Sequence, residues 1–243
     1  MRKGIDIVGP ESKQILFDAG TISDMNYQYL CLGVFFDQYA KRHDFTKELP
    51  DNVKIATGGV SGYIIKKDHL SKLLQLAYSN INDISFFHYL LTIHSLKGAV
   101  TAMFEAFGNH KCPNIEIRNA FRTELFNDNK NKFDEFDGII RFIRNVLIHN
   151  IRDQFRIRSQ DFDKQKSYWM NNKKKSIMKF EFSYNQVDSP IKIDNYNAKC
   201  DIVIDWNNVK DDVLFGDLVS DFQCFMLIEF CRNSLYLLNK KYN

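Results

Sequence analysis

Proline and glycine are scarce in this chain, and their scarcity limits the folds that it can adopt. Only four prolines and eleven glycines occur in 243 residues, whereas phenylalanine occurs 21 times and tyrosine 11 times. A sandwich or barrel of many short strands needs frequent turn residues, while long helices need few. The sequence therefore predicts a mostly helical protein.

Apolar residues recur at helical spacing in several stretches. We expect helices over residues 23–44, 68–80, 82–108, 113–129, 130–150 and 212–241. Ser23 or Asp24 is expected to cap the first of these helices, and Pro113 suits a helix start. The helix over 130–150 carries a core-facing stripe with spacings of four, three and four residues, formed by Phe136, Ile140, Ile143 and Leu147.

Strand patterns are confined to short segments. Residues 177–185 and 200–207 alternate apolar and polar side chains, which predicts two strands of a small hairpin-like sheet. Three glycines make residues 51–67 a loop or small hairpin. We therefore predict one domain over residues 1–243, a helical bundle in which residues 152–212 form a basic loop and a small β-hairpin insertion before the C-terminal helix.

Charge and cysteine content exclude few function classes. The net charge is only +3, from 33 basic and 30 acidic residues, so a polyanionic partner is permitted but not required. Five cysteines without a C-x-x-C pair fit reduced thiols in the cytosol. No signal peptide and no run of about 18 apolar residues is found, so we expect a cytoplasmic protein without a membrane segment.

The stretch RFIRNVLIHN, residues 141–150, combines an apolar helix with an unusual set of polar side chains. Arg141, Asn145 and His149 are successive neighbours four residues apart, which predicts a polar ridge beside the apolar stripe. Arg144 can lean towards this ridge, and Asn150 suits a C-cap. Guanidinium groups bind phosphate in a bidentate fashion, and an imidazole exchanges protons near neutral pH. This set suits cleavage of a phosphodiester without a metal.

Residues 144–149 follow the pattern R-N-x-x-x-H, which resembles the R-x(4–6)-H motif of the HEPN superfamily (higher eukaryotes and prokaryotes nucleotide-binding domains). The resemblance covers the helices from about residue 82 to residue 150. It implies a helical bundle with the motif at the end of a late core helix. The first 80 residues, the basic loop and the β insertion match no pattern of the family.

The resemblance implies a function as well as a fold. HEPN proteins are often metal-independent ribonucleases of toxin–antitoxin, abortive-infection and CRISPR systems, and they usually form homodimers with one composite site. We therefore expect an endoribonuclease of prokaryotic defence or toxin systems, without metal or cofactor, whose partners are RNA, a second copy and an antitoxin or other regulatory protein. His149 would act as general acid or base, Arg144 would stabilise the transition state, and Asn145 would orient His149 or the phosphate by hydrogen bonding. Arg141 and Asn150 are candidate substrate contacts.

The segment from Arg152 to Lys179 holds nine basic and three acidic residues. We expect an exposed loop in which Lys173, Lys174 and Lys175 bind RNA, with Tyr168 and Trp169 stacking on bases. The alternative is a solvated loop without a ligand.

Other functions remain open from the sequence. The domain could bind RNA, a nucleotide or a partner protein without cleaving, or it could be a structural adaptor whose polar ridge is an interface. Arg144 and His149 could instead serve only in surface ion pairs and a helix cap. A metal-dependent nuclease is disfavoured, because no H-x-E or H-E-x-x-H pattern and no convincing carboxylate cluster occurs.

Overall fold

Helices form most of the part of the chain that the computed structural model describes, which is residues 8–42, 50–55, 63–69, 72, 84–109, 111–149, 155–183 and 199–243. The long helices are α1 (Pro10–Arg42), α3 (Ile84–Phe107), α4 (Ile115–Phe126), α5 (Lys130–His149) and α8 (Asp221–Tyr242). The prediction of a mostly helical protein with a small antiparallel sheet is confirmed. None of the helices in these ranges is both long and apolar enough to cross a membrane.

The chain divides into two compact units, a division that the prediction of one domain over residues 1–243 does not include. Residues 30–91 form one unit, and residues 1–29 together with 92–243 form the other. In the first unit, β1 (Asn52–Ile55) pairs antiparallel with β2 (Tyr63–Lys66), so this segment is a small hairpin. Most of the helix predicted over 68–80 lies outside the described residues.

The larger unit is built around phenylalanine. Eight rings from α3, α4, α5, the sheet and α8 make successive contacts with centroid separations between 4.7 and 6.1 Å, namely Phe107, Phe121, Phe126, Phe133, Phe136, Phe180, Phe182 and Phe230. Aromatic pairs of this kind favour edge-to-face and tilted arrangements. The cluster explains the high phenylalanine content, and it fixes α5 between its neighbours.

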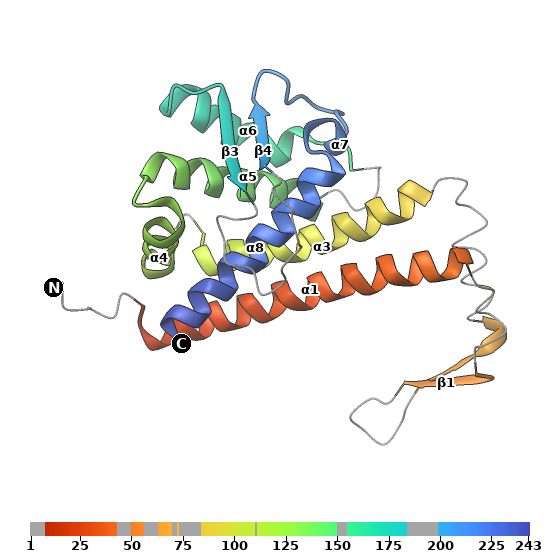
Figure 1. Cartoon of the computed structure of the whole chain (residues 1–243). Helices are drawn as coiled ribbons and strands as arrows, with labels where there is room; N and C mark the ends of the chain where they lie inside the picture. The colour runs from red at the N-terminus through yellow and green to blue at the C-terminus, as the bar shows by residue number, and fades with distance from the viewer. Residues whose placement is uncertain are drawn as a thin grey trace. The chain divides into compact units, whose positions relative to one another are not determined.

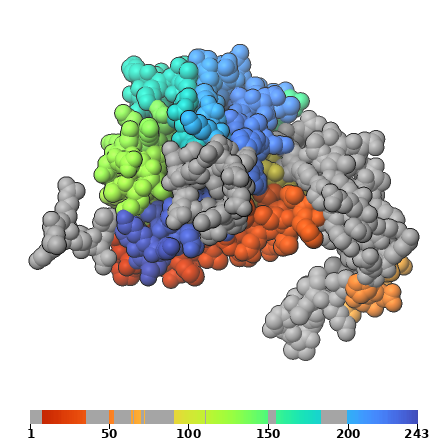
Figure 2. Space-filling model, in the orientation of Figure 1, coloured from red at the N-terminus to blue at the C-terminus, as the bar shows by residue number. Residues whose placement is uncertain are grey.

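The sheet of the larger unit packs one face on α5. In β3 (Ile177–Ser183) and β4 (Lys199–Asp205), which pair antiparallel, alternate residues are buried. Phe180 on β3 lies opposite Ile202 on β4, and the Phe180 ring is 4.7 Å from that of Phe136 on α5. The predicted hairpin-like sheet is confirmed in this place. On the face shown in Figure 2, the α4 region (green) and this sheet (cyan to light blue) form one continuous surface.

Two helix starts differ from the sequence prediction. Helix α1 begins at Pro10, which suits the first helical position, so Ser23 and Asp24 lie inside the helix and cannot cap it. Ser23 is buried, and Asp24 accepts a hydrogen bond from Arg232 Nε of α8 at 2.6 Å, where the two helices cross (Figure 1). Helix α4 begins at Ile115, so Pro113 lies before the helix rather than at its start; Asn114 is the cap, and its side chain accepts a hydrogen bond from the Ile117 amide.

The long C-terminal helix is interrupted. A short helix α7 (Phe215–Leu218) ends before Ser220, and Ser220 forms a capping box with Gln223 that starts α8. The Ser220 amide donates to Gln223 Oε1 at 2.8 Å, and the Gln223 amide donates to Ser220 Oγ at 3.4 Å. The prediction of one continuous helix over 212–241 is therefore wrong at this point.

The basic segment before the sheet is helical. Helix α6 (Ser159–Ser167) continues into a π-helical turn, η2 (Tyr168–Asn172), which leads to β3. The prediction of an exposed loop over residues 152–179 is wrong for this part. Trp169 is buried against Gly138 of α5, where an added Cβ would approach the indole ring to 2.8 Å. This packing anchors the segment to α5, because a buried indole removes a large apolar area from water.

Candidate functional site

The R-N-x-x-x-H motif lies at the C-terminal end of α5, as the sequence predicted. His149 is the last residue of the helix, and its side chain is 45% exposed. Arg144 and Asn145 are partly buried one turn earlier. Asn150, a candidate C-cap and substrate contact, lies outside the described residues. The helix end therefore presents an accessible imidazole beside partly buried polar groups.

The imidazole of His149 is held by a buried carboxylate. His149 Nδ1 lies 2.9 Å from Oδ1 of Asp161, whose side chain is fully buried. Since a carboxylate only accepts hydrogen bonds, Nδ1 is the nitrogen that carries the proton. Nε2 makes no hydrogen bond within the described part of the chain. This leaves Nε2 able to take a proton from a bound substrate or to give one to it.

Asp161 is itself fixed by the start of α6. Its Oδ2 accepts a hydrogen bond from the Arg158 amide at 2.9 Å, which is one half of a capping box. Sequence reasoning missed Asp161, because the segment was expected to be a loop. Arg158 is not a usual capping residue, so the sequence carries no capping-box pattern that points to Asp161.

Arg144 packs over an aromatic ring. Its Cζ atom lies 4.5 Å from the centroid of Phe104 on α3, and Nη1 donates to Asn145 Oδ1 at 3.3 Å. Nε is buried and has no hydrogen-bond partner in the ranges described above. Stacking on Phe104 limits the directions that the guanidinium can take, so the group is positioned before any substrate binds.

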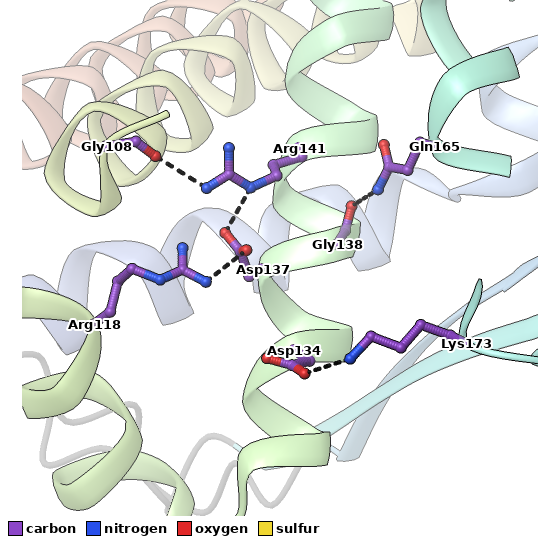
Figure 3. A network of polar contacts seen from close by, with 8 residues as sticks. All are labelled: Gly108, Arg118, Asp134, Asp137, Gly138, Arg141, Gln165 and Lys173. Atoms are coloured by element: carbon purple, nitrogen blue, oxygen red, sulfur yellow. Dashed lines mark hydrogen bonds and ion pairs between the residues drawn. The ribbon is translucent and has the colours of Figure 1, made fainter. Parts of the chain in front are cut away.

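Arg141 belongs to an internal network rather than to an exposed ridge. Only 6% of the residue is exposed, its Nε donates to Asp137 Oδ1 at 2.9 Å, and its Nη2 donates to the Gly108 carbonyl at 3.0 Å. Asp137 also accepts from Arg118 Nη2 at 3.0 Å (Figure 3). The polar ridge inferred from helical spacing is therefore wrong at Arg141, and this arginine joins α3, α4 and α5.

Two of the three lysines after η2 are paired with carboxylates of α5. Lys173 Nζ lies 2.9 Å from Asp134 Oδ2, and Lys175 Nζ lies 2.5 Å from Glu135 Oε1. The hydrogen bond to Asp134 raises the pKa of Lys173. Lys174 is exposed and has a positive φ of 56°. The three side chains thus differ in their surroundings, and only Lys174 is fully directed to solvent.

A cleft of about 570 Å³ runs beside the motif. Its walls come from the end of α3 and from α4, α5, α6 and η2, and its lining includes Asn145, Gln160, Asp161, Lys164 and Tyr168. Figure 3 shows part of its polar lining, where Gln165 donates to the Gly138 carbonyl and Lys173 reaches Asp134. The lining includes Asn145 of the motif and Asp161, the hydrogen-bond partner of His149, but neither Arg144 nor His149 itself.

Within the described ranges, no group of three or more His, Cys, Asp or Glu side chains is arranged to hold a metal ion. The five cysteines are unpaired, and burial raises the pKa of Cys200 to about 12. Buried thiols of this kind act as small apolar side chains rather than nucleophiles.

Comparison with protein-family models, with curated proteins and with solved structures finds no match to this chain.

Proposed function

We propose that the chain is a HEPN-like, metal-independent endoribonuclease that acts in the cytoplasm as a prokaryotic defence or toxin effector. The observation that carries the proposal is the pair formed by His149 and Asp161, joined at 2.9 Å at the end of α5. An exposed imidazole held by a buried carboxylate is the arrangement that proton transfer requires. The motif R-N-x-x-x-H supplies the guanidinium and the amide beside it.

The reaction is a transesterification within RNA. The 2′-oxygen attacks the neighbouring phosphorus as a base removes its proton, and the bond from phosphorus to the 5′-oxygen breaks as an acid protonates the leaving oxygen. The products are a 2′,3′-cyclic phosphate and a 5′-hydroxyl. His149 performs one of the two proton transfers through Nε2, and assistance of this type typically contributes about 10²–10⁴-fold to the rate.

Arg144 has an electrostatic role in this reaction. Negative charge builds up on the phosphorane-like transition state, and a guanidinium positioned over Phe104 stabilises it without having to reorganise. Asn145, whose side-chain oxygen accepts from Arg144, helps to orient that group. Because each chain supplies one His149, the second proton transfer falls to the His149 of a second copy in a two-fold homodimer.

The test is cleavage of mixed tRNA in EDTA by the wild type, by His149→Ala and by Arg144→Ala. We expect cyclic-phosphate ends from the wild type only, and no cleavage of an all-deoxy strand, which lacks the 2′-hydroxyl. The matched controls are His94→Ala, at an exposed position of α3, and Arg156→Ala, at a partly exposed position before α6 where the arginine pairs with Asp212. Cleavage that survives His149→Ala, or equal cleavage of DNA, would contradict the proposal.

The dimer has its own test. Specific activity should rise with protein concentration in the range where sedimentation shows a monomer–dimer equilibrium. A strict monomer that binds RNA without cleaving it would favour the alternative of a non-catalytic RNA-, nucleotide- or partner-binding module.

A further inference from the structure

The cleft beside the motif has the dimensions of a small-molecule site. Its volume of about 570 Å³ lies in the range of pockets that enclose a drug-sized ligand. A nucleotide, with a base, a sugar and a phosphate, is a ligand of that size. Three aromatic rings line the cleft, those of Phe104, Tyr168 and Trp169, and most of its other lining residues are polar or charged.

The charge of the cleft favours an anion. Four cations line it, namely Arg118, Arg141, Lys164 and Lys173, against three carboxylates, Asp134, Asp137 and Asp161. Each carboxylate already has a partner on the protein: Lys173 pairs with Asp134, the two arginines with Asp137, and His149 with Asp161. Lys164 forms no ion pair with any residue in the described ranges. Its ammonium group is therefore the cation of the cleft that is available to a ligand.

The remaining polar groups suit a nucleobase. Asn109, Asn145 and Gln160 place side-chain amides around the cleft, and each amide carries both a donor and an acceptor. The edges of nucleobases present the same mixture of donors and acceptors. Tyr168 on η2 is 46% exposed and offers a ring on which a planar base can stack.

The position of the cleft links its ligand to the reaction. Asp161 holds His149 and also lines the cleft, and Asn145 accepts from Arg144 and also lines it. A nucleotide seated there would be the one beside the phosphodiester that His149 and Arg144 act on.

We propose that this cleft binds one nucleotide of the RNA strand next to the cleaved bond, with Lys164 on its phosphate and Gln160 on the edge of its base. The inference rests on the proposed ribonuclease function, because it assigns a role to the cleft of the same site. A free mononucleotide has the same chemistry, so the experiment below includes both sources.

Binding is measured with three probes by fluorescence anisotropy and calorimetry: a 2′-O-methyl RNA oligonucleotide that cannot be cleaved, a nucleoside 3′-monophosphate, and inorganic phosphate. We expect Lys164→Met to weaken oligonucleotide binding about tenfold. The salt slope, which is the slope of log K for binding against log salt concentration, should fall in magnitude by about one. Gln160→Ala should weaken binding of the oligonucleotide and leave its salt slope unchanged. Lys240→Met, an exposed lysine at the end of α8, is the control and should bind as the wild type does.

Each outcome separates this inference from the ribonuclease itself. The side chain of Lys164 makes no hydrogen bond or ion pair with the described residues, and unchanged circular dichroism would show that the variant folds. If Lys164→Met and Lys240→Met bind the oligonucleotide alike, or if the wild type binds no probe, the cleft is not a nucleotide site, even when cleavage is intact. If Lys164→Met loses binding while no protein cleaves RNA, the cleft assignment stands and the nuclease fails. Tight binding of the monophosphate by the wild type, lost in Lys164→Met, would identify a free nucleotide as the occupant and overturn the assignment to RNA.

Discussion

At the scale of single residues, the interaction between His149 and Asp161 is more than a helix cap requires. A capping histidine needs no buried partner, whereas Asp161 is fully buried and is itself held by the Arg158 amide. Burying a carboxylate is costly unless it is hydrogen-bonded, and here both of its oxygens accept hydrogen bonds. The burial of Asp161 is therefore compensated, and the carboxylate is held in one position beside His149.

We predict that Asp161→Asn lowers the rate of RNA cleavage by about 10²-fold with little change in KM, because the amide no longer fixes the proton on Nδ1. The amide oxygen can still accept from the Arg158 amide, so α6 should keep its start. Nitrogen NMR of His149 reports the tautomer directly and should show a mixture in the variant. Asp163→Asn, two residues along the same helix and exposed, is the control. A rate equal to that of the control would remove Asp161 from the mechanism.

The sequence predicted the motif residues but not their surroundings. Arg144, Asn145 and His149 lie at a helix end because the apolar stripe from Phe136 to Leu147 defines the helix on its own. Arg141 has the spacing of a ridge residue, yet the carbonyl of Gly108 and the carboxylate of Asp137 draw it into the interior. Such partners come from distant parts of the chain, so helical periodicity cannot reveal them.

At the scale of elements, the attachment of η2 to α5 shapes the cleft. Gly138 faces Trp169 so closely that a Cβ at this position would lie 2.8 Å from the indole and 2.8 Å from Met178 Sδ. A glycine inside a helix costs about 1 kcal/mol relative to alanine, so this residue is explained by the packing that it permits. The sequence predicts a loop here because most residues of the segment are charged or polar. Its two buried apolar side chains, Phe162 and Trp169, are too few to give a helical pattern.

We predict that Gly138→Ala lowers the free energy of unfolding by about 1–3 kcal/mol, because overpacking against a rigid indole outweighs the gain in helix propensity. Urea denaturation measures the change. In a double-mutant cycle with Trp169→Leu, the smaller side chain should relieve the clash, so the double variant should be more stable than the sum of the single effects implies. If the effects of the two substitutions on the free energy of unfolding simply add, the indole of Trp169 does not restrict the side chain at position 138.

At the scale of the whole molecule, a buried carboxyl group couples stability to pH. Glu229 on α8 is 1% exposed, and burial raises its pKa, opposed by hydrogen bonds from Tyr27 and Asn233 and by the charge of Arg232. Its Oε1 has no hydrogen-bond partner in the part of the chain that the structure describes. The strongest contact of Arg232 is with Asp24, at 2.6 Å, so Glu229 is only partly compensated.

When folding raises the pKa of a carboxyl group, its contribution to stability is complete at pH values below the pKa of the unfolded state, about 4.3 for Glu. This contribution is lost as the pH rises through the higher pKa of the folded state. Glu229→Gln keeps the shape and stays neutral, so it should not suffer that loss. We therefore predict that the variant gains stability relative to the wild type as pH rises from about 4 to about 8, measured by urea denaturation. Glu105→Gln, at an exposed position of α3, controls for the loss of one negative charge. A difference between Glu229→Gln and wild type that stays constant with pH would mean that folding does not raise the pKa of Glu229, because the charge of Arg232 and the hydrogen bonds offset its burial.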